Sequence, residues 1–533
     1  MSFSKIALFP SLTAWRKVFY VAAFLFSITV YISIYKYLWR FVSYPIELEW
    51  REGPYWLHAL AQSYGINIFK NDKIAYVMAV HGIFDHLIKA ALLSVFRSWE
   101  PQYILRFFVL IFPVVSFFSI FVQSRRSLPA IAALISALCL NGAMLVALHD
   151  IGHWFTCVGR SDPTALTLLA IAYLCYATHR SSYLAKVFQH FSSLAIALVL
   201  STNWKWYPIA LMIPLIMEQR QDTLRIRELI RIYLVILGYT LATCALFAVV
   251  WFHGDISFYF RYFVGLFFGK SPYAGSSAPF QTIIHYVRTP AIAFLILFSV
   301  LPAFIEAWRL FRKHSGNWPR TLAAIAVLVS LLIQILALKM NFMAGGYWYL
   351  CPQVIVLVIY YNTRYKIGPG LATVILVLGL CILWRSDNLP LIRWYYAQLG
   401  ETLPAARKYT QELILLDHVF GIYSEEAHLF RRSKNLPPID MGDGSENLAK
   451  VNYYGPRFTS IFEGQRSKVI AHQPVLLFVG ACPSSAFKAL SMNEEYCLLL
   501  NSPAPAIGGG VYVRIDHMED VQRVLMGHAA NPQ

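Results

Sequence analysis

Long apolar runs separated by short polar segments make up the first three quarters of the chain. Most runs are about 17–22 residues long, the length that a helix needs to cross a bilayer. They predict about eleven transmembrane helices, at residues 18–38, 103–122, 128–148, 163–178, 187–201, 206–217, 231–252, 290–309, 321–339, 348–361 and 369–384.

The segment 77–97 is less apolar than these runs and carries Asp85 and Lys89. If it crossed the membrane, the basic loops "SRRS" and "HRSSYLAK" would both lie outside. If it lies at the surface as an amphipathic or re-entrant helix, both loops lie inside, as the positive-inside rule favours. We therefore predict a surface helix here, with a cytoplasmic N-terminus and an outer C-terminus.

Composition supports this division of the chain. The protein is 58 % hydrophobic and carries a formal net charge of +17. Residues 1–384 contain 31 Lys and Arg against 13 Asp and Glu, whereas residues 385–533 contain 14 against 15. The basic excess lies in short loops of the membrane part, where it sets orientation. Membrane topology explains the charge, and we predict no nucleic-acid partner.

The chain after residue 384 is predicted to be a separate, extracytoplasmic α+β domain. A Trp- and Tyr-rich helix opens it, and the apolar runs "PVLLFVG", "EYCLLLN" and "GGVYVRI", split by turn residues, predict strands. A role in holding an acceptor and a purely stabilising role are both open. Cys482 and Cys497 form a disulfide or remain two free thiols.

Acidic residues of the membrane part gather in the predicted outer loops. The first of these, residues 39–102, is long for a helix connection, and such loops are often functional. Glu49 and Glu52 lie one helical turn apart there, close to Glu47. Two neighbouring carboxylates raise the pKa of one of them, which suits a general base. The alternative is an ordinary solvated acidic loop.

The second outer loop contains Arg160 and Asp162. Asp162 precedes a proline, which suits the start of a helix and is the alternative to a chemical role. Asp150 and its neighbouring histidines match no standard zinc spacing, so we predict no metal site, although a divalent metal cofactor stays open.

Cations also lie on the predicted outer side. Lys205 and Lys339 lie at outer helix ends, where they either extend towards the interface or bind an anion such as a lipid phosphate. The long segment 253–289 combines aromatic residues with basic ones and is a candidate lid over a lipid substrate. Its basic residues are Arg261, Lys270 and Arg288.

Four short motifs follow one another along the chain: "E-x-x-E-G" at 49–53, "G-x-x-[IL]-[FY]" at 65–69, "G-R-x-D-x-x-A-L" at 159–166 and "K-x-N-x-x-x-G-G-x-x-Y" at 339–349. Together they resemble the GT-C superfamily of polytopic membrane glycosyltransferases. That superfamily includes bacterial lipid A sugar transferases, protein mannosyltransferases and the catalytic subunit of oligosaccharyltransferase. The resemblance covers residues 18–384.

The resemblance implies an enzyme that takes a sugar from a polyprenyl-phosphate or polyprenyl-pyrophosphate donor. It would transfer a hexose or pentose to a glycan, lipid or protein acceptor on the outer face of a bacterial plasma membrane. The resemblance assigns the base to Glu49, with Glu52 as second choice, and the second-loop acid to Asp162 beside Arg160. Lys205 and Lys339 fall where relatives hold the donor phosphate.

Candidates for the acceptor side or the lid are His58, Arg261, Lys270, Arg288 and Tyr347. A single displacement with one base predicts inversion at the anomeric carbon. The alternative functions are a transporter or flippase of lipid-linked saccharides and a polysaccharide ligase. The charges lie at helix ends and not at mid-membrane, which favours surface chemistry over transport.

Overall fold

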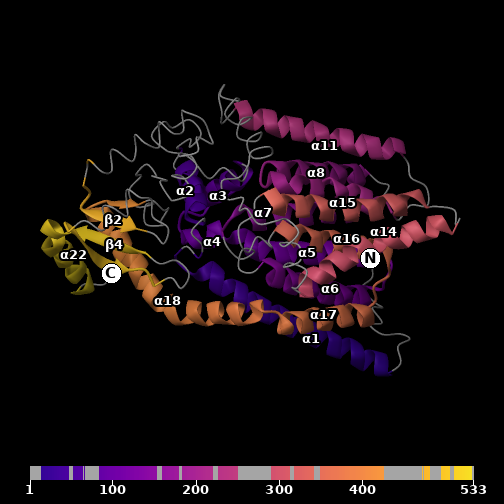
Figure 1. Ribbon diagram of the computed structural model, residues 1–533, viewed down its shortest axis with the longest axis horizontal. Coiled ribbons are helices and arrows are strands. Elements are labelled where there is room, and N and C mark those ends of the chain that lie inside the picture. Colours follow the sequence, from indigo (N-terminus) through magenta and orange to yellow (C-terminus); the bar gives the residue numbers. More distant parts are fainter. Residues whose placement is uncertain are drawn as a thin grey trace, which may run out of the picture.

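Figure 1 shows the computed structural model as a ribbon. It describes residues 14–46, 48, 52–63, 65, 83–152, 159–178, 183–219, 226–249, 290–312, 317–340, 349–424, 471, 473–479, 494–503 and 509–530. A bundle of long helices forms one part of the molecule, and a small sheet lies beyond one end of it (Figure 1). We call this end of the bundle the sheet end.

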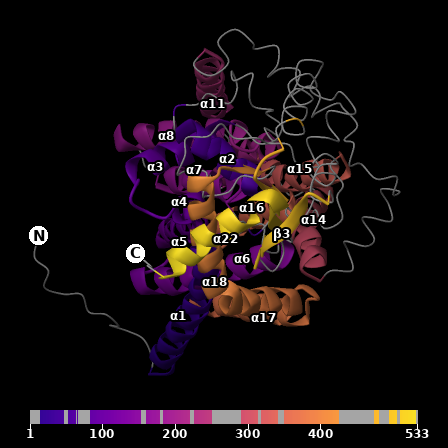
Figure 2. The ribbon, with the colours of Figure 1, turned by 90° about the vertical axis from the view of Figure 1, so that its left-hand side faces the viewer.

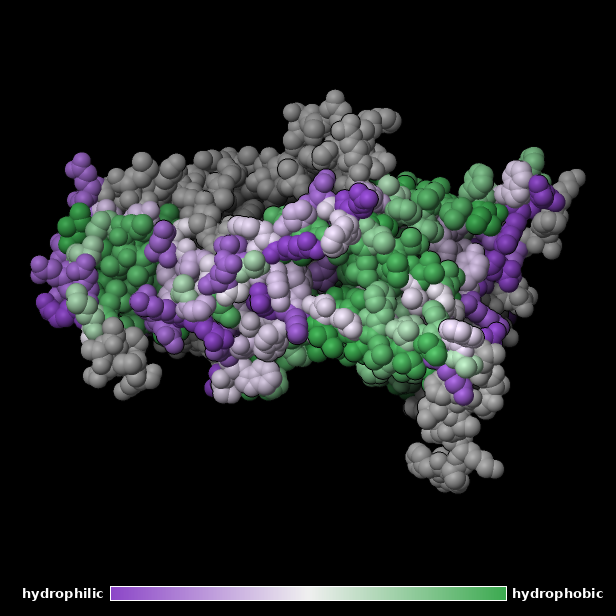
Figure 3. Space-filling model, turned by 90° about the horizontal axis from the view of Figure 1, so that it is seen from below, coloured by the Kyte–Doolittle hydropathy of each residue, from purple (hydrophilic) through white to green (hydrophobic). Residues whose placement is uncertain are grey.

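Over the residues that the structure describes, each predicted transmembrane segment falls on helix. The bundle helices are α1 (Ala14–Ser43), α5 (Phe107–Arg125), α6 (Ala130–Gly152), α7 (Ser161–Thr178), α8 (Tyr183–Leu200), α9 (Tyr207–Ala210), α10 (Met212–Glu218), α11 (Ile226–Phe247), α14 (Pro290–Phe311), α15 (Trp318–Met340), α16 (Cys351–Arg364) and α17 (Pro369–Arg385). Figure 3 shows apolar side chains forming a band over the bundle, with polar side chains at both ends. The protein is thus an α-helical integral membrane protein.

Six helices of the described residues are long and apolar enough to cross a membrane: α1, α4 (Pro101–Leu105) together with α5, α6, α11, α14 and α15. A seventh results if α17 and the next helix, α18 (Asn388–Val419), count as one span bent by 83°. The predicted number of eleven transmembrane helices is not confirmed. The described part of the ambiguous segment 77–97 contains α3 (Ile83–Val95), and these 13 residues alone are too few to cross a bilayer.

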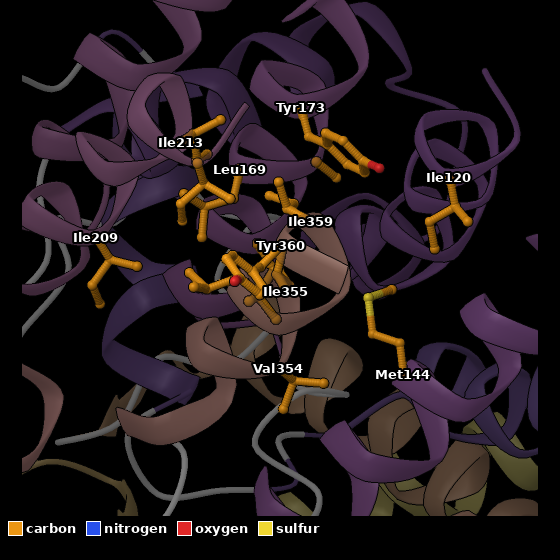
Figure 4. Close-up of a cluster of buried hydrophobic side chains, with 14 of the residues drawn as sticks. Ile120, Met144, Leu169, Tyr173, Ile209, Ile213, Val354, Ile355, Ile359 and Tyr360 are labelled. Atoms are coloured by element: carbon orange, nitrogen blue, oxygen red, sulfur yellow. The ribbon is translucent and has the colours of Figure 1, made fainter. Parts of the chain in front are cut away.

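Burial distinguishes the helices inside the bundle from those at its edge. In α6, 83 % of the apolar window is buried, against 17 % in α1, whose side chains are left to face lipid. Figure 4 shows part of the central core, where Leu169 of α7, Ile213 of α10 and Ile359 of α16 gather. Lipid tails are as apolar as these side chains, so close packing and buried hydrogen bonds hold the helices together.

A buried polar cluster supplies such hydrogen bonds between α14, α15 and α16. The Gln353 amide donates to Ser299 Oγ at 2.9 Å, and its oxygen accepts from Ser330 Oγ at 2.6 Å and Gln334 Nε2 at 2.7 Å. All four side chains are buried, and each has a partner. The cluster fixes the three helices against one another.

The sheet has four strands in the order β1-β2-β4-β3, with β1 and β2 parallel and the other pairs antiparallel. Three of them confirm the strand predictions: β2 (Leu476–Val479), β3 (Tyr496–Asn501) and β4 (Gly510–Arg514). β1 (Ile422–Ser424) and the last helix, α22 (Met518–Ala530), were not predicted. In Figure 2 the sheet and α22 lie in front of the bundle helices.

A second hydrophobic core joins the sheet to the bundle. It includes Phe41 and Tyr44 at the end of α1, Leu413 of α18 and Val511 of β4, all buried. Tyr44 also shares a hydrogen bond of 2.9 Å with Thr402 of α18. The beginning of the first loop is therefore packed against the C-terminal part of the chain. The predicted domain boundary at 384/385 stays a prediction.

The choice between a Cys482–Cys497 disulfide and two free thiols stays as the sequence left it. The Cys497 thiol of β3 lies 3.7 Å from the carbonyl oxygen of Val513, and Cys482 lies outside the described residues.

Candidate active site

Glu52 and Arg106 form a buried ion pair at the sheet end of the bundle. Glu52 begins α2 (Glu52–Ser63), and Arg106 lies between α4 and α5. Arg106 donates from Nε to Glu52 Oε1 at 2.7 Å and from Nη2 to Oε2 at 2.9 Å. Both side chains are fully buried. This bidentate geometry is the strongest form of the Arg–carboxylate pair.

The same guanidinium also holds the chain that leads into the first loop. Its remaining donors reach the carbonyl oxygens of Phe41, Tyr44 and Ile46 at 2.6–2.9 Å. All five N–H groups of Arg106 are therefore used, and its guanidinium carbon lies 4.6 Å from the centre of the Trp56 ring. Arg106 fixes the backbone that precedes the acidic cluster.

Glu52 has no free lone pair for a substrate. Besides the two Arg106 bonds, its oxygens accept from the backbone N–H of Leu48 at 2.7 Å and of Gly159 at 2.5 Å. Four hydrogen bonds use the accepting sites of an ionised carboxylate. This geometry argues against Glu52 as the base, for which it was the second choice from sequence. Glu52 instead fixes the backbone at Leu48 and Gly159. Glu49, three positions before Glu52, lies outside the described residues.

Gly159 is the point where the second loop meets the first. A Cβ atom at this position would collide with Trp56 Nε1 and lie 3.0 Å from Glu52 Oε1 and 3.1 Å from the Leu105 carbonyl oxygen. This close approach explains why the "G-R-x-D" motif begins with glycine.

Gly159→Ala is therefore expected to separate the two loops. Overpacking of this kind costs about 1–3 kcal/mol, and we expect a lower thermal midpoint in detergent together with reduced activity. Gly238→Ala on α11, where an added Cβ meets nothing within 4 Å, is the matched control and should lower neither property, because alanine is the better helix former. Unchanged stability in Gly159→Ala would contradict the described contact.

Asp162 lies in the first turn of α7 and is buried. Arg160 Nε lies 3.3 Å from Asp162 Oδ2, and Asn203 Nδ2 donates to Oδ1 at 3.3 Å. The N-terminal end of a helix favours a carboxylate. The structure thus brings Arg160 and Asp162 together, as the motif suggested.

Lys205 lies on the short 3-10 helix η2 (Trp204–Trp206) and is buried. Its ammonium donates to Tyr349 Oη at 2.9 Å and lies 4.8 Å from the centre of that ring and 5.6 Å from the Trp204 ring. The ammonium is thus enclosed by protein side chains, and the choice between an interfacial and an anion-binding role stays a prediction. An aromatic surrounding of this kind stabilises a cation that is shielded from water.

Sequence reasoning missed Asp85 and Lys89 as members of this site. Lys89 Nζ donates to Asp85 Oδ2 at 2.8 Å and to the carbonyl oxygens of Gly159 and Arg160 at 2.6 and 3.0 Å, while the Thr164 hydroxyl donates to Asp85. Burial raises the pKa of Asp85, and Lys89 acts in the opposite direction. The available signal was an opposite-charge pair at i, i+4 inside an otherwise apolar helix.

Several predicted residues cannot be placed. Glu49, Arg261, Lys270, Arg288 and Tyr347 lie outside the described residues. His58 is on α2 and Lys339 is near the end of α15, but their side chains are not described. Their roles stay predictions. Within the described ranges, no group of three or more His, Cys, Asp or Glu side chains is arranged to hold a metal ion.

The sequence matches no family model and no curated protein. Two solved structures share its fold. ArnT from Cupriavidus metallidurans in the apo state gives a TM-score of 0.53 at 12 % identity, over 92 % of this chain and 98 % of that one. The same ArnT bound to undecaprenyl phosphate gives a TM-score of 0.52 at 11 % identity, over 94 % of this chain and 98 % of that one. The chain therefore has the fold of ArnT over most of its length. This confirms the predicted fold class, an α-helical membrane protein of this kind, and the chain carries the predicted small C-terminal sheet.

Proposed function

We propose that this protein is an inverting glycosyltransferase that moves a sugar from a polyprenyl-phosphate donor to a glycan, lipid or protein acceptor at the outer face of a bacterial plasma membrane. The observation that carries the proposal is the buried junction of the first and second loops, through Glu52, Arg106 and Gly159. It lies at one end of a GT-C fold, and one structure with that fold holds undecaprenyl phosphate.

In this proposal Glu49 is the base that takes the proton of the acceptor hydroxyl. The neighbouring ion pair of Glu52 and Arg106 supports this assignment, because it fixes the chain on both sides of Glu49. All hydrogen-bond acceptor sites of the Glu52 carboxylate are already occupied, so Glu52 has none left for a substrate hydroxyl. The acceptor oxygen attacks the anomeric carbon as the lipid phosphate departs from the opposite face. One displacement of this kind inverts the anomeric configuration.

Cations stabilise the departing phosphate. Lys205 is the described candidate, with Lys339 from the neighbouring α15 as the second. A buried ammonium near a developing phosphate charge acts strongly because little water competes with it. Arg160 is paired with Asp162 and would contribute as part of that pair.

The distribution of basic residues supports placing the sheet end outside. α5, α14 and α16 each carry an arginine in the last turn, namely Arg125, Arg309 and Arg364. Arg364 and Arg309 both reach Glu306, at 3.7 and 2.8 Å, so the ends of α14 and α16 lie together. α5 begins beside Arg106 at the sheet end, which puts Arg125 at the opposite end. The positive-inside rule makes that opposite end cytoplasmic.

Lys205→Met is expected to raise KM for the donor and lower kcat, together giving about a 10- to 100-fold loss in kcat/KM. The reason is the loss of positive charge next to the phosphate, while the side-chain volume is kept. Lys408→Met on α18 removes a lysine whose side chain is 78 % exposed and is the matched control. Equal kcat/KM in both variants would show that Lys205 has no role at the phosphate.

Purified protein in proteoliposomes tests the reaction itself. Polyprenyl-phosphate-linked hexoses and pentoses are supplied with candidate acceptors, and release of the polyprenyl phosphate is followed. We expect release that depends on the acceptor, and NMR should show an inverted anomer. A retained anomer would contradict the single displacement. Movement of the intact lipid-linked sugar between leaflets without release would indicate a transporter.

A further inference from the structure

We infer that Asp85 and Lys89 of α3 form a positioning pair that sets Asp162 against the first loop. The inference rests on the proposed function, because it gives Asp162 a place in the reaction. Neither member of the pair is a catalytic residue here, since both act through the chain around Asp162.

The pair holds the segment around Asp162 on both sides. On one side, Lys89 Nζ binds the carbonyl oxygens of Gly159 and Arg160, at 2.6 and 3.0 Å. On the other, Asp85 accepts from the Thr164 hydroxyl in the first turn of α7. The two members are joined at 2.8 Å. Movement of α3 would therefore move the backbone that carries Asp162.

The same short helix also contacts the chain that supplies the partner of Asp162. The backbone N–H of Phe84 donates to the Ser201 carbonyl oxygen at 2.8 Å. Two residues later, Asn203 donates its amide to Asp162 Oδ1. α3 thus fixes both Asp162 and Asn203, and the backbone N–H of Gly159 connects this assembly to Glu52.

The burial of the pair argues that it is kept for position and not for stability. Asp85 and Lys89 are at most 1 % exposed. A buried ion pair is often no more stable than apolar side chains of similar size, because both charges lose their hydration. The Lys89 ammonium binds two carbonyl oxygens and the Asp85 carboxylate with its three N–H donors, which an apolar side chain of similar size cannot do.

The test compares a double variant with a matched control. Asp85→Asn/Lys89→Met removes both charges, so no unpaired charge stays buried. Lys408→Met/Glu412→Gln removes another i, i+4 pair, 3.7 Å apart on the surface of α18. Thr164→Val is a second, milder variant, which deletes one hydrogen bond to Asp85 and keeps the side-chain shape.

For each variant we measure the thermal midpoint, kcat, KM for the donor and amide hydrogen exchange of residues 159–166. The double variant is expected to lose about 10- to 100-fold in kcat, as expected for a misplaced group, with KM nearly unchanged. Exchange in 159–166 should rise, and Thr164→Val should show the same changes to a smaller extent. The surface control should match the wild type.

Wild-type kcat and wild-type exchange in both the double variant and Thr164→Val would overturn the inference. If the double variant does not fold, Thr164→Val alone decides in the same way. Failure of the proposed function is a separate result: the wild-type protein would then transfer no sugar. In that case the exchange of residues 159–166 still shows whether the pair positions this segment.

Discussion

Arg106→Met is expected to reduce sugar transfer by about 100-fold or more, since loss of positioning can cost that much, and to lower stability by about 3–5 kcal/mol, the usual cost of breaking a buried ion pair. The variant leaves the Glu52 carboxylate buried without its cation. It also leaves the carbonyl oxygens of Phe41, Tyr44 and Ile46 without their donor. The chain leading to Glu49 would lose its anchor.

Two controls separate the causes of this loss. Arg106→Lys keeps the charge but not the planar fork, so it should recover part of the stability and little of the activity. Arg523→Met on α22 removes an arginine whose side chain is 77 % exposed and should change neither property. Full activity in Arg106→Met would show that the hydrogen bonds of Arg106 have no part in positioning the site.

The second large effect is expected at Glu49. Glu49→Gln removes the proposed base, and loss of a general base costs about 10²–10⁴ in rate. Because the anchor through Glu52 is untouched, the thermal midpoint should stay that of the wild type. Glu52→Gln should behave differently, with stability and activity falling together, because it weakens the pair with Arg106.

Comparing the two variants resolves the ambiguity that the sequence leaves between the two carboxylates. Transfer at full rate by Glu49→Gln would exclude Glu49 as the base. Full activity and full stability in both variants would make the first loop a solvated connection, the alternative that the acidic cluster left open.

The sequence predicted the helices well because their signal is local. Each apolar run became a helix, and the alternating runs of the tail became β2, β3 and β4. β1 escaped because its three residues form a strand only by pairing with β2, more than 50 residues later. The predicted number of spans was not confirmed, because some bundle helices are too short or too polar to cross a bilayer alone.

The candidate site was predicted only in part, because its decisive contacts are non-local. The "E-x-x-E" and "G-R-x-D" motifs located Glu52 and Asp162, but not which of their oxygens would be occupied. Arg106 follows no motif, and its pairing with Glu52 joins residues 54 positions apart. Lys89 resembled a polar residue of a surface helix, and its contacts with Gly159 and Arg160 span about 70 positions.

The most direct test of the account is mass spectrometry of the cell-envelope glycans. The comparison includes the wild type, a deletion strain, and the deletion strain complemented with either the wild-type gene or Glu49→Gln at equal membrane abundance. We predict a glycan, lipid or protein that lacks one sugar in the deletion strain. The wild-type gene should restore that sugar and Glu49→Gln should not. Identical envelope glycans in all four strains, or full restoration by Glu49→Gln, would contradict the account.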